Sequence, residues 1–307
     1  MTCNWGVTRR KNALRARAEI IRVIRGFFHG EGYLEVETPL LIPAPAPEAH
    51  IDAVPCGDRY LHTSPELAMK RLVAAGYGRI YQICRCWRDG ERGRLHIPEF
   101  TMLEWYRSDA DYLTLMEECE ALISAVACSI ALGDTVAYQG HCIGLGGKWE
   151  RSTVREAFRR YTRYSMEEAL KAGLFDDLMV AEIEPRLGLT APVFIRDYPA
   201  SRGALAKLKG DDPSVAERFE LYMGGVEIAN AFTELVDPVE QRARFIREEE
   251  LRRSSGKKAY PLPERFLEEL EHMPPSAGIA LGIDRLVMVL LDAPSIDDVV
   301  AFTPEEL

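Results

Sequence analysis

The clearest pattern of apolar and polar positions lies near the start of the chain. Across residues 13–28, apolar residues recur at helical spacing and arginines fill much of the remaining face. Glycines at positions 30 and 32 follow, and residues 33–38 then alternate between apolar and polar before Pro39. The sequence therefore predicts an amphipathic helix, a turn, and a strand that ends at the proline.

Helix and strand signals also alternate through the rest of the chain. Apolar spacing predicts one helix around residues 69–73 and another over residues 111–131. Strands are predicted over residues 192–198 and 219–234, the second folded back at the glycine pair 224–225. This order indicates an α+β protein, built on a mainly antiparallel sheet with helices packed against it.

Two stretches follow neither the helical nor the strand period. Residues 40–47 are rich in proline and are expected to form a loop over a pocket. Residues 134–148 contain four glycines, which is typical of a flexible connection or an insertion. The remaining predicted elements account for the core.

Composition limits the number of domains and the kinds of partner. The chain has 307 residues, of which 47% are hydrophobic, so it can bury a large core. This length allows one domain or two, and we predict one that spans residues 1–307. The 38 basic and 48 acidic side chains give a formal net charge of −10, the wrong sign for extensive binding of nucleic acid.

The sequence indicates neither a membrane-spanning segment nor a set of disulfide bonds. The N-terminus has no apolar signal segment, and no run approaches the ~20 apolar residues of a membrane span, so we expect a cytoplasmic protein. The seven cysteines include no CxxC pair, which argues against disulfides and against a zinc ribbon. Cys84 and Cys86 are expected to be buried strand residues rather than redox groups.

The segment richest in candidate chemistry spans residues 85–106, which read as a strand, a charged turn and a second strand. Alternate residues of a strand share a face, so this hairpin can aim an arginine, a histidine, an aromatic ring and a carboxylate into one pocket. That combination suits a charged nucleotide. Far downstream, residues 278–285 form a run of small and apolar residues that ends in Arg285.

These two segments resemble motifs 2 and 3 of class II aminoacyl-tRNA synthetases. The helix, strand and proline over residues 13–39 resemble motif 1, although that unit alone would be an ordinary helix and strand. The resemblance implies the class II catalytic core. It also implies a homodimer, because motif 1 builds the dimer interface in that family.

A site that activates an amino acid with ATP needs a cation beside the α-phosphate and a flat apolar surface for adenine. The guanidinium of Arg88 can fork to two oxygens and is the candidate clamp for α-phosphate and carboxylate. Arg285 is the candidate for the far phosphate, and Phe100 can stack on adenine with His96 nearby. Each could instead be an ordinary ion-paired or packed side chain, but their order and spacing favour the site.

A metal site is predicted at the second hairpin. Glu220 and Glu227 lie seven residues apart on either side of the turn at 224–225, so both carboxylates could converge on one Mg²⁺. Glu227 is also assigned to the nucleotide site. Without the other motifs, a pair of solvated surface acids would be the simpler interpretation.

Residues 63–66, 102–106 and 224–235 are similar to the lysyl branch of the family. That resemblance implies a lysine-shaped pocket, in which Glu104 and Glu234, helped by Tyr106, hold the side-chain ammonium. Glu66 would meet the backbone-side amine. Acids around a buried cation make physical sense, because an unpaired charge there would be heavily penalised. Two further residues complete the implied substrate-binding set, Ala229 and Asn230.

Lysyl-tRNA synthetases carry an N-terminal OB-fold that reads the anticodon, whereas only about a dozen residues precede the first helix predicted here. The sequence is therefore most similar to the free-standing paralogues, which activate lysine, preferably (R)-β-lysine, and attach it to a lysine of elongation factor P. Ala229 and the alanine at position 280 agree with that group. One departure is Gly90, where motif 2 usually has glutamate; we expect Glu91 to substitute through a small shift of the turn.

Two other functions stay open on the sequence. A truncated lysyl-tRNA synthetase would charge tRNA, which the acidic balance and the missing anticodon domain oppose. A catalytically silent paralogue would act as a lysine sensor or regulatory subunit. Such a sensor would not need the full phosphate and metal set of Arg88, Glu220, Glu227 and Arg285.

Overall fold

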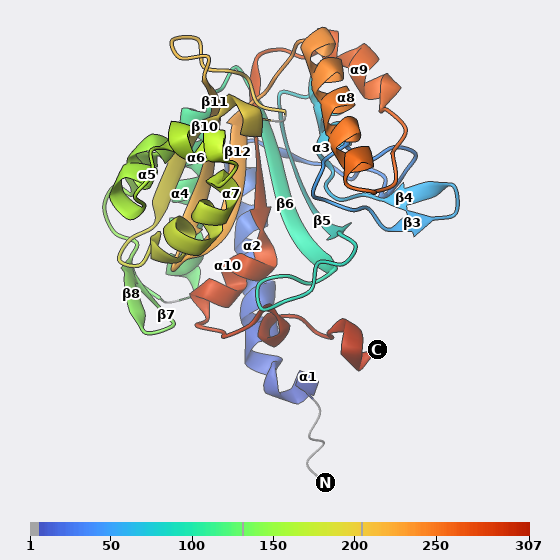
Figure 1. Cartoon of the computed structure of the whole chain (residues 1–307). Coiled ribbons are helices and arrows are strands. Elements are labelled where there is room, and N and C mark those ends of the chain that lie inside the picture. The colour runs from blue at the N-terminus through green and yellow to red at the C-terminus, as the bar shows by residue number, and fades with distance from the viewer. Residues whose placement is uncertain (1–5, 131, 204) are drawn as a thin grey trace.

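An eight-stranded sheet forms the centre of the computed structural model, which describes residues 6–130, 132–203 and 205–307 (Figure 1). Its end pairs, β1–β5 and β9–β10, are parallel and all other neighbours are antiparallel. The predicted α+β class is therefore confirmed. In spatial order the strands are β1 (Leu34–Glu35), β5 (Arg79–Trp87), β6 (Glu99–Ser108), β13 (Ser276–Gly282), β12 (Val226–Thr233), β11 (Val215–Met223), β10 (Val193–Pro199) and β9 (Glu150–Thr153).

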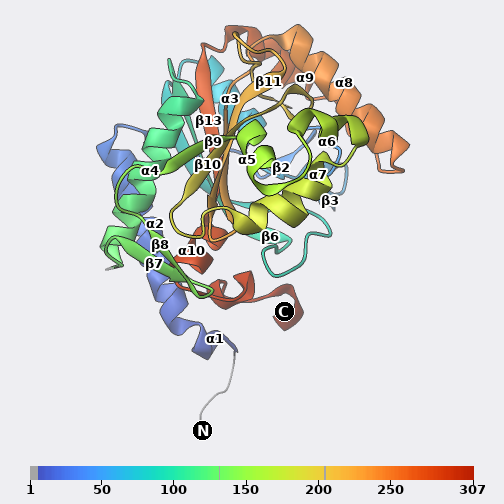
Figure 2. The ribbon, with the colours of Figure 1, turned by 60° about the vertical axis from the view of Figure 1, so that its left-hand side comes forward.

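One face of the sheet is covered by three helices, α2 (Lys11–Gly30), α4 (Tyr112–Ser129) and α10 (Ile283–Leu290) (Figure 2). Their apolar sides and the sheet residues beneath them form the largest hydrophobic cluster, which includes Phe28 and Trp105. The side chain of Asp111 caps α4 by accepting from the backbone N–H groups of residues 113 and 114. This is the helix predicted over 111–131, of which residue 131 lies outside the described ranges.

Helices on the other face stand in two groups with open sheet between them. One group is α3 (Glu66–Ala74), α8 (Pro238–Ser254) and α9 (Glu264–Glu269), and its cluster centres on Met69 and Phe266. The second is α5 (Val154–Tyr161), α6 (Met166–Ala172) and α7 (Phe175–Leu178), packed on β10 and β11. The gap between the groups exposes the strand residues that matter for function.

The smaller elements lie at the periphery. They are α1 (Gly6–Arg9), the three-stranded sheet of β2 (Leu41–Ile42), β3 (Pro55–Cys56) and β4 (Arg59–Leu61), and the hairpin of β7 (Thr135–Tyr138) and β8 (His141–Gly144). Single turns of 3₁₀ helix occur at Glu184–Arg186, Ala200–Arg202, Leu270–His272, Ile296–Val299 and Pro304–Glu306, and a π-helical turn at Met179–Ile183.

Two sequence-based expectations need correction. The strand predicted over residues 33–38 shrinks to the two residues of β1, with one further backbone bond from Val36 to Tyr81. Residues 134–148, expected to be a flexible connection or an insertion, contain the ordered β7–β8 hairpin. Gln139 and Gly140 both have positive φ, 49° and 81°, which is the geometry of a tight two-residue hairpin turn. At least one of the glycines therefore marks a turn rather than disorder.

A buried polar junction ties three distant segments together. Asp284 at the start of α10 accepts from the backbone N–H of Thr101 at 2.6 Å and pairs with Arg17 of α2. Arg17 also donates to the Thr101 hydroxyl at 2.7 Å. The junction fixes the first helix, β6 and α10 relative to one another, directly behind the open part of the sheet.

Candidate active site

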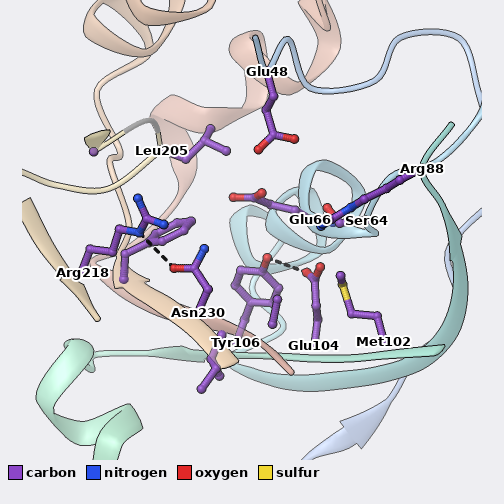
Figure 3. Close-up of a pocket in the computed structure, with 15 residues that line it drawn as sticks. Glu48, Ser64, Glu66, Arg88, Met102, Glu104, Tyr106, Leu205, Arg218 and Asn230 are labelled. Carbon is purple, nitrogen blue, oxygen red and sulfur yellow. Dashed lines mark hydrogen bonds between the residues drawn. The ribbon is translucent and has the colours of Figure 1, made fainter. Parts of the chain in front are cut away.

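Two adjoining cavities open on the sheet between the two helical groups. The inner cavity is about 140 Å³ and the outer one about 270 Å³. They share one wall, which comes from the loop before β3, from β6, β11, β12 and β13, and from the turn after β5. The shared residues are Glu48, Arg88, Met102, Arg218, Asn230 and Ala280. Figure 3 shows all of these except Ala280 by label, with Glu48 above the strands and Arg88 at one side.

Carboxyl groups and one lysine dominate the inner cavity. Glu104 and Tyr106 point from β6, and the Tyr106 hydroxyl donates to Glu104 at 2.9 Å (Figure 3). Behind them the buried Lys70 bridges Glu66 at 2.6 Å and Glu234 at 2.5 Å. Lys70 stands one turn after Glu66 on α3, so the helix itself sets their spacing. The structure thus brings the four predicted lysine-pocket residues together, with a lysine of the chain among them.

The carboxyl groups in and behind this cavity lack some of the positive charges and hydrogen-bond donors that would stabilise their ionised forms. Burial raises the pKa of Glu104 well above its ordinary value, and the nearby Glu66 raises it further. Burial raises the pKa of Glu234 to about 8, although Lys70 opposes this shift. One oxygen of Glu104 and Oε1 of Glu234 are buried without a hydrogen-bond partner. Such groups are costly to leave unpaired, so the cavity is suited to a ligand that carries positive charge.

Gly278 on β13 is the point where backbone, ring and carboxylate approach most closely. A Cβ there would lie 2.3 Å from the Tyr106 ring and 2.5 Å from Oε1 of Glu234. Both partners are buried and cannot move away easily. The first glycine of residues 278–285 is therefore required by the packing behind the inner cavity.

Arg88 stands between the two cavities. Its guanidinium carbon lies 5.1 Å from the centre of the Phe100 ring, and its Nε is buried without a hydrogen-bond partner. Glu48 lies in the loop that follows the proline-rich residues 40–47; burial raises the pKa of Glu48 to about 7, while Arg88 acts to lower it. A guanidinium with an unsatisfied donor at this junction can receive an anionic group from either cavity.

A second arginine, Arg218 of β11, borders both cavities. It donates to the side-chain oxygen of Asn230 at 3.0 Å (Figure 3). It also donates to Glu220 at 2.6 Å. Its guanidinium also lies 4.5 Å from the centre of the Tyr198 ring. Asn230 is thereby held facing the shared wall, in the position that the sequence assigned to substrate binding.

Arg285 is fixed at the outer cavity by groups from two other segments. It donates to the backbone and side chain of Glu227 at 3.1 and 3.0 Å, and to the carbonyl of Leu95 at 3.2 Å. It also meets Nε2 of His96 at 2.6 Å, and because arginine can only donate, this nitrogen accepts. Burial and the charge of Arg285 lower the pKa of His96, so the imidazole is neutral at pH 7.

The turn between β5 and β6 carries the unusual motif 2 residues. Gly90 has φ of 75° and open space beside its Cα, so the backbone itself selects glycine there. Glu91 lines the outer cavity and lies 3.9 Å from Arg88. The residue expected to compensate for the missing glutamate is thus at the site.

The predicted metal ligands lie near each other but in different surroundings. Glu227 borders the outer cavity, whereas Glu220 is buried beside it and accepts from the hydroxyls of Tyr198 and Tyr222 at 2.5 and 2.6 Å. A third acid, Glu184, joins them: burial raises its pKa to about 7, and the charges of Glu220 and Glu227 add to the shift. Glu220 and Glu227 offer the hard oxygen ligands that Mg²⁺ prefers, and in this structure Glu220 is paired with Arg218 and Glu227 with Arg285.

Two alanines that agree with the free-standing paralogues occupy different faces of the sheet. Ala229 lies opposite Leu221 and Leu281 in the strand register, and it belongs to the hydrophobic core while bordering the outer cavity. Ala280 faces the cavities and borders both. The predicted role of Ala229 in substrate choice stays a prediction.

Four residues of the site were missed on the sequence. Arg218 could have been found, because it alternates with Glu220 and Tyr222 and so shares their face. Lys70 could have been found from its helical spacing to Glu66. Glu48 comes from a loop and Glu184 from a single turn of 3₁₀ helix, where no period links them to the site.

Comparison with known proteins agrees with this geometry. The family of class II tRNA synthetases (D, K and N) matches residues 5–306, and the chain belongs to that family. Among curated relatives, an elongation factor P–(R)-β-lysine ligase of Edwardsiella ictaluri is 41% identical and covers 94% of each chain. The ligase of the same name from Proteus mirabilis is also 41% identical, again over 94% of each chain.

Lysine–tRNA ligases are relatives too, but this chain spans less of them. The enzyme of Pelotomaculum thermopropionicum is 39% identical over 95% of this chain, which corresponds to 63% of that protein. Within the described ranges, no helix combines the length and the apolar character that crossing a membrane requires.

Proposed function

We propose that this protein activates lysine, by preference (R)-β-lysine, with ATP and ligates it to a lysine of elongation factor P. The observation that supports this most strongly is the pair of cavities joined at Arg88. The inner one is lined by carboxyl groups and the outer one by arginines and an aromatic ring. Relatives named for this reaction match almost their whole length.

Charge balance supports a substrate with two amines. Glu66, Glu104 and Glu234 together can carry three negative charges, and Lys70 supplies one positive charge. Lysine and β-lysine each bring two ammonium groups, which would leave the pocket neutral. In this arrangement the orphaned oxygens of Glu104 and Glu234 receive the substrate ammonium, and Tyr106 orients Glu104. Glu66 and Asn230 would then lie nearer the reacting end of the substrate.

In the first step, the substrate carboxylate attacks the α-phosphorus of ATP, and pyrophosphate leaves. Arg88 holds the carboxylate and the α-phosphate together and offsets the charge that develops between them. Phe100 and His96 accommodate adenine, with Glu91 at the rim of the same cavity. Arg285, held by Glu227 and the motif 2 turn, meets the far phosphates.

Glu220 and Glu227 would hold Mg²⁺, with Glu184 close enough to assist. The ion would offset triphosphate charge during the first step. Glu220 is held in place beside the outer cavity by its tyrosine partners and Arg218.

In the second step, the amine of the acceptor lysine attacks the aminoacyl-adenylate, an amide forms and AMP leaves. The acceptor must first lose a proton, and Glu48 lies between both cavities with its pKa raised to about 7 by burial. That value suits a group which takes up a proton at neutral pH.

The same proposal includes a cytoplasmic homodimer. Leu34 lies in β1, the edge strand of the large sheet, and Leu40 and Leu41 follow it along the chain; they are 50%, 40% and 39% exposed. Exposed apolar side chains of this kind can be buried in an interface. Size-exclusion chromatography with light scattering tests it: a monomeric mass at micromolar concentration would contradict the dimer.

Exchange of labelled pyrophosphate into ATP tests the activation step directly. The proposal expects exchange that depends on lysine or β-lysine and on Mg²⁺. No exchange with any lysine isomer would instead favour the catalytically silent lysine sensor.

A further inference from the structure

His62, Cys84 and Cys86 form a side-chain cluster that the proposed reaction does not use. The two sulfur atoms are 3.9 Å apart, and Nε2 of His62 lies 3.9 Å from Cys84 Sγ and 3.8 Å from Cys86 Sγ. His62 and Cys86 are buried, and Cys84 is half-buried. Within the described ranges, this is the group in which three potential metal ligands come together.

The spacing of these atoms matches that of ligands around one thiophilic metal ion. Tetrahedral zinc has bonds of about 2.3 Å to sulfur and about 2.0–2.1 Å to nitrogen, which places neighbouring ligand atoms roughly 3.6–3.8 Å apart. Each of the three separations here lies within a few tenths of an ångström of that range. An ion could therefore enter once the His62 ring turns its Nε2 from the Arg85 carbonyl, 2.7 Å away, toward the two sulfur atoms.

We propose that His62, Cys84 and Cys86 bind a thiophilic divalent cation of the Zn²⁺ class through one nitrogen and two thiolates. The fourth position is open to water. Two sulfur ligands and an imidazole favour Zn²⁺ strongly over Mg²⁺, which prefers oxygen. The site is thus chemically separate from the carboxylates that would hold the catalytic magnesium.

Binding exchanges protons in a defined way. The carbonyl of Arg85 can only accept, so Nε2 of His62 carries the proton in their 2.7 Å contact. To ligate a metal, His62 must move this proton to Nδ1, and each thiol must lose its proton to solvent. One divalent cation therefore replaces two thiol protons, and affinity should rise with pH.

The position of the cluster gives the site a structural role. His62 precedes α3, whose first residue is Glu66, while Cys84 and Cys86 lie on β5, which leads into Arg88. The two segments already meet through the backbone bond from Trp87 to the carbonyl of His62 at 3.1 Å. A metal would cross-link them beside the lysine pocket and hold its walls together.

The test is titration of the full-length protein, in a thiol-free reductant, with Co²⁺ as a spectroscopic substitute for Zn²⁺. We expect one equivalent to give thiolate-to-cobalt charge-transfer absorption and intense tetrahedral d–d bands, both abolished by adding Zn²⁺. Cys84→Ser and Cys86→Ser should each remove the charge-transfer band or weaken binding at least ~10-fold. Cys128→Ser, which alters an exposed cysteine elsewhere, is the matched control and should bind like the parent.

Thermal unfolding provides a second readout that does not depend on activity. Saturating Zn²⁺ should raise the Tm of the parent and of Cys128→Ser by a few degrees, and should leave Cys84→Ser unchanged. His62→Gln keeps a donor for the Arg85 carbonyl and should fold, yet it should bind Co²⁺ at least ~10-fold more weakly. Absence of the charge-transfer band in the parent, or binding of Co²⁺ by Cys84→Ser as tight as by the parent, would overturn the proposal.

Discussion

At the scale of single residues, the site contains charged groups that have unsatisfied hydrogen-bonding atoms in the protein alone. Arg88 has a buried donor with no acceptor, and Glu104 and Glu234 have buried oxygens with no donor. Arg88 and Glu104 line the cavities, where a substrate carboxylate and ammonium would meet them, and Glu234 is buried behind Gly278 of the inner cavity. Their roles can be separated by substitution.

Arg88→Ala should reduce lysine-dependent pyrophosphate exchange by at least ~100-fold, a typical loss for one electrostatic stabiliser of a transition state. Glu220→Ala should have a similar effect through the metal. Arg85→Ala, which removes a neighbouring exposed arginine, is the control and should stay within severalfold of the parent. Exchange that survives in Arg88→Ala would remove Arg88 from its proposed role.

Substrate choice is a second property that belongs to this scale. Ala229→Gly is predicted to shift the kcat/KM ratio toward α-lysine by tenfold or more, since a methyl-sized change in a close pocket is worth about 1–3 kcal/mol. Its methyl group lies on the core side, so the effect must pass through the position of β12. Ala280→Gly removes a methyl that faces both cavities and provides the comparison.

Steady-state exchange with each isomer measures both variants, and circular dichroism checks that they fold. Ala→Gly costs roughly 0.5–1 kcal/mol of stability in a strand without changing preference. An unchanged ratio in a well-folded Ala229→Gly would show that Ala229 is only a packing residue.

At the scale of elements, the turn between β5 and β6 is the clearest departure from the family. Glu91→Ala should raise the KM for ATP, because Glu91 is the acid of this turn that borders the outer cavity. Gly90→Glu should leave the KM for ATP nearly unchanged while lowering stability, because φ at Gly90 is 75° and disfavours a side chain. Exchange kinetics with ATP varied, together with Tm, distinguish the two effects.

The opposite pattern, with a lowered KM in Gly90→Glu and no effect of Glu91→Ala, would mean that the site has lost a contact without compensation. In that case the proposed shift of the turn would be wrong.

Many of the helices and strands could be predicted from the sequence, and the exceptions have physical causes. The β5–β6 hairpin and the β11–β12 hairpin follow from alternation and from glycines at the turn. The β7–β8 hairpin was mistaken for a flexible segment because its strands are only four residues long. The cluster of His62, Cys84 and Cys86 was missed because its histidine is 22 residues away and reaches the cysteines only through the fold.

Some residues of the candidate site could also be predicted from the sequence, and others could not. Motif residues such as Arg88, Glu104 and Arg285 were predicted because the resemblance carries them one by one. Lys70 was not predicted, although it forms ion pairs with Glu66 and Glu234, two of the acids that the resemblance assigned to substrate binding. Glu48 and Glu184 come from segments without periodicity, so only their three-dimensional position reveals them.

At the scale of the whole molecule, metal use should depend on pH. Burial, with Glu220 and Glu227, raises the pKa of Glu184 to about 7, so this carboxyl group is protonated in mild acid and ionised above neutrality. The Mg²⁺ concentration for half-maximal exchange should therefore fall as pH rises from about 6 to about 8. Glu184→Gln should weaken that dependence. A parallel pH profile in the variant would exclude Glu184 from the metal site.

The central claim is that the aminoacyl-adenylate goes to a protein amine. The most direct measurement incubates the protein with ATP, Mg²⁺ and labelled (R)-β-lysine, with purified elongation factor P in one reaction and bulk tRNA in another. The account predicts label joined to elongation factor P by a bond that survives mild alkali, as an amide does, and no label on tRNA. Efficient charging of tRNA with no label on elongation factor P would contradict it.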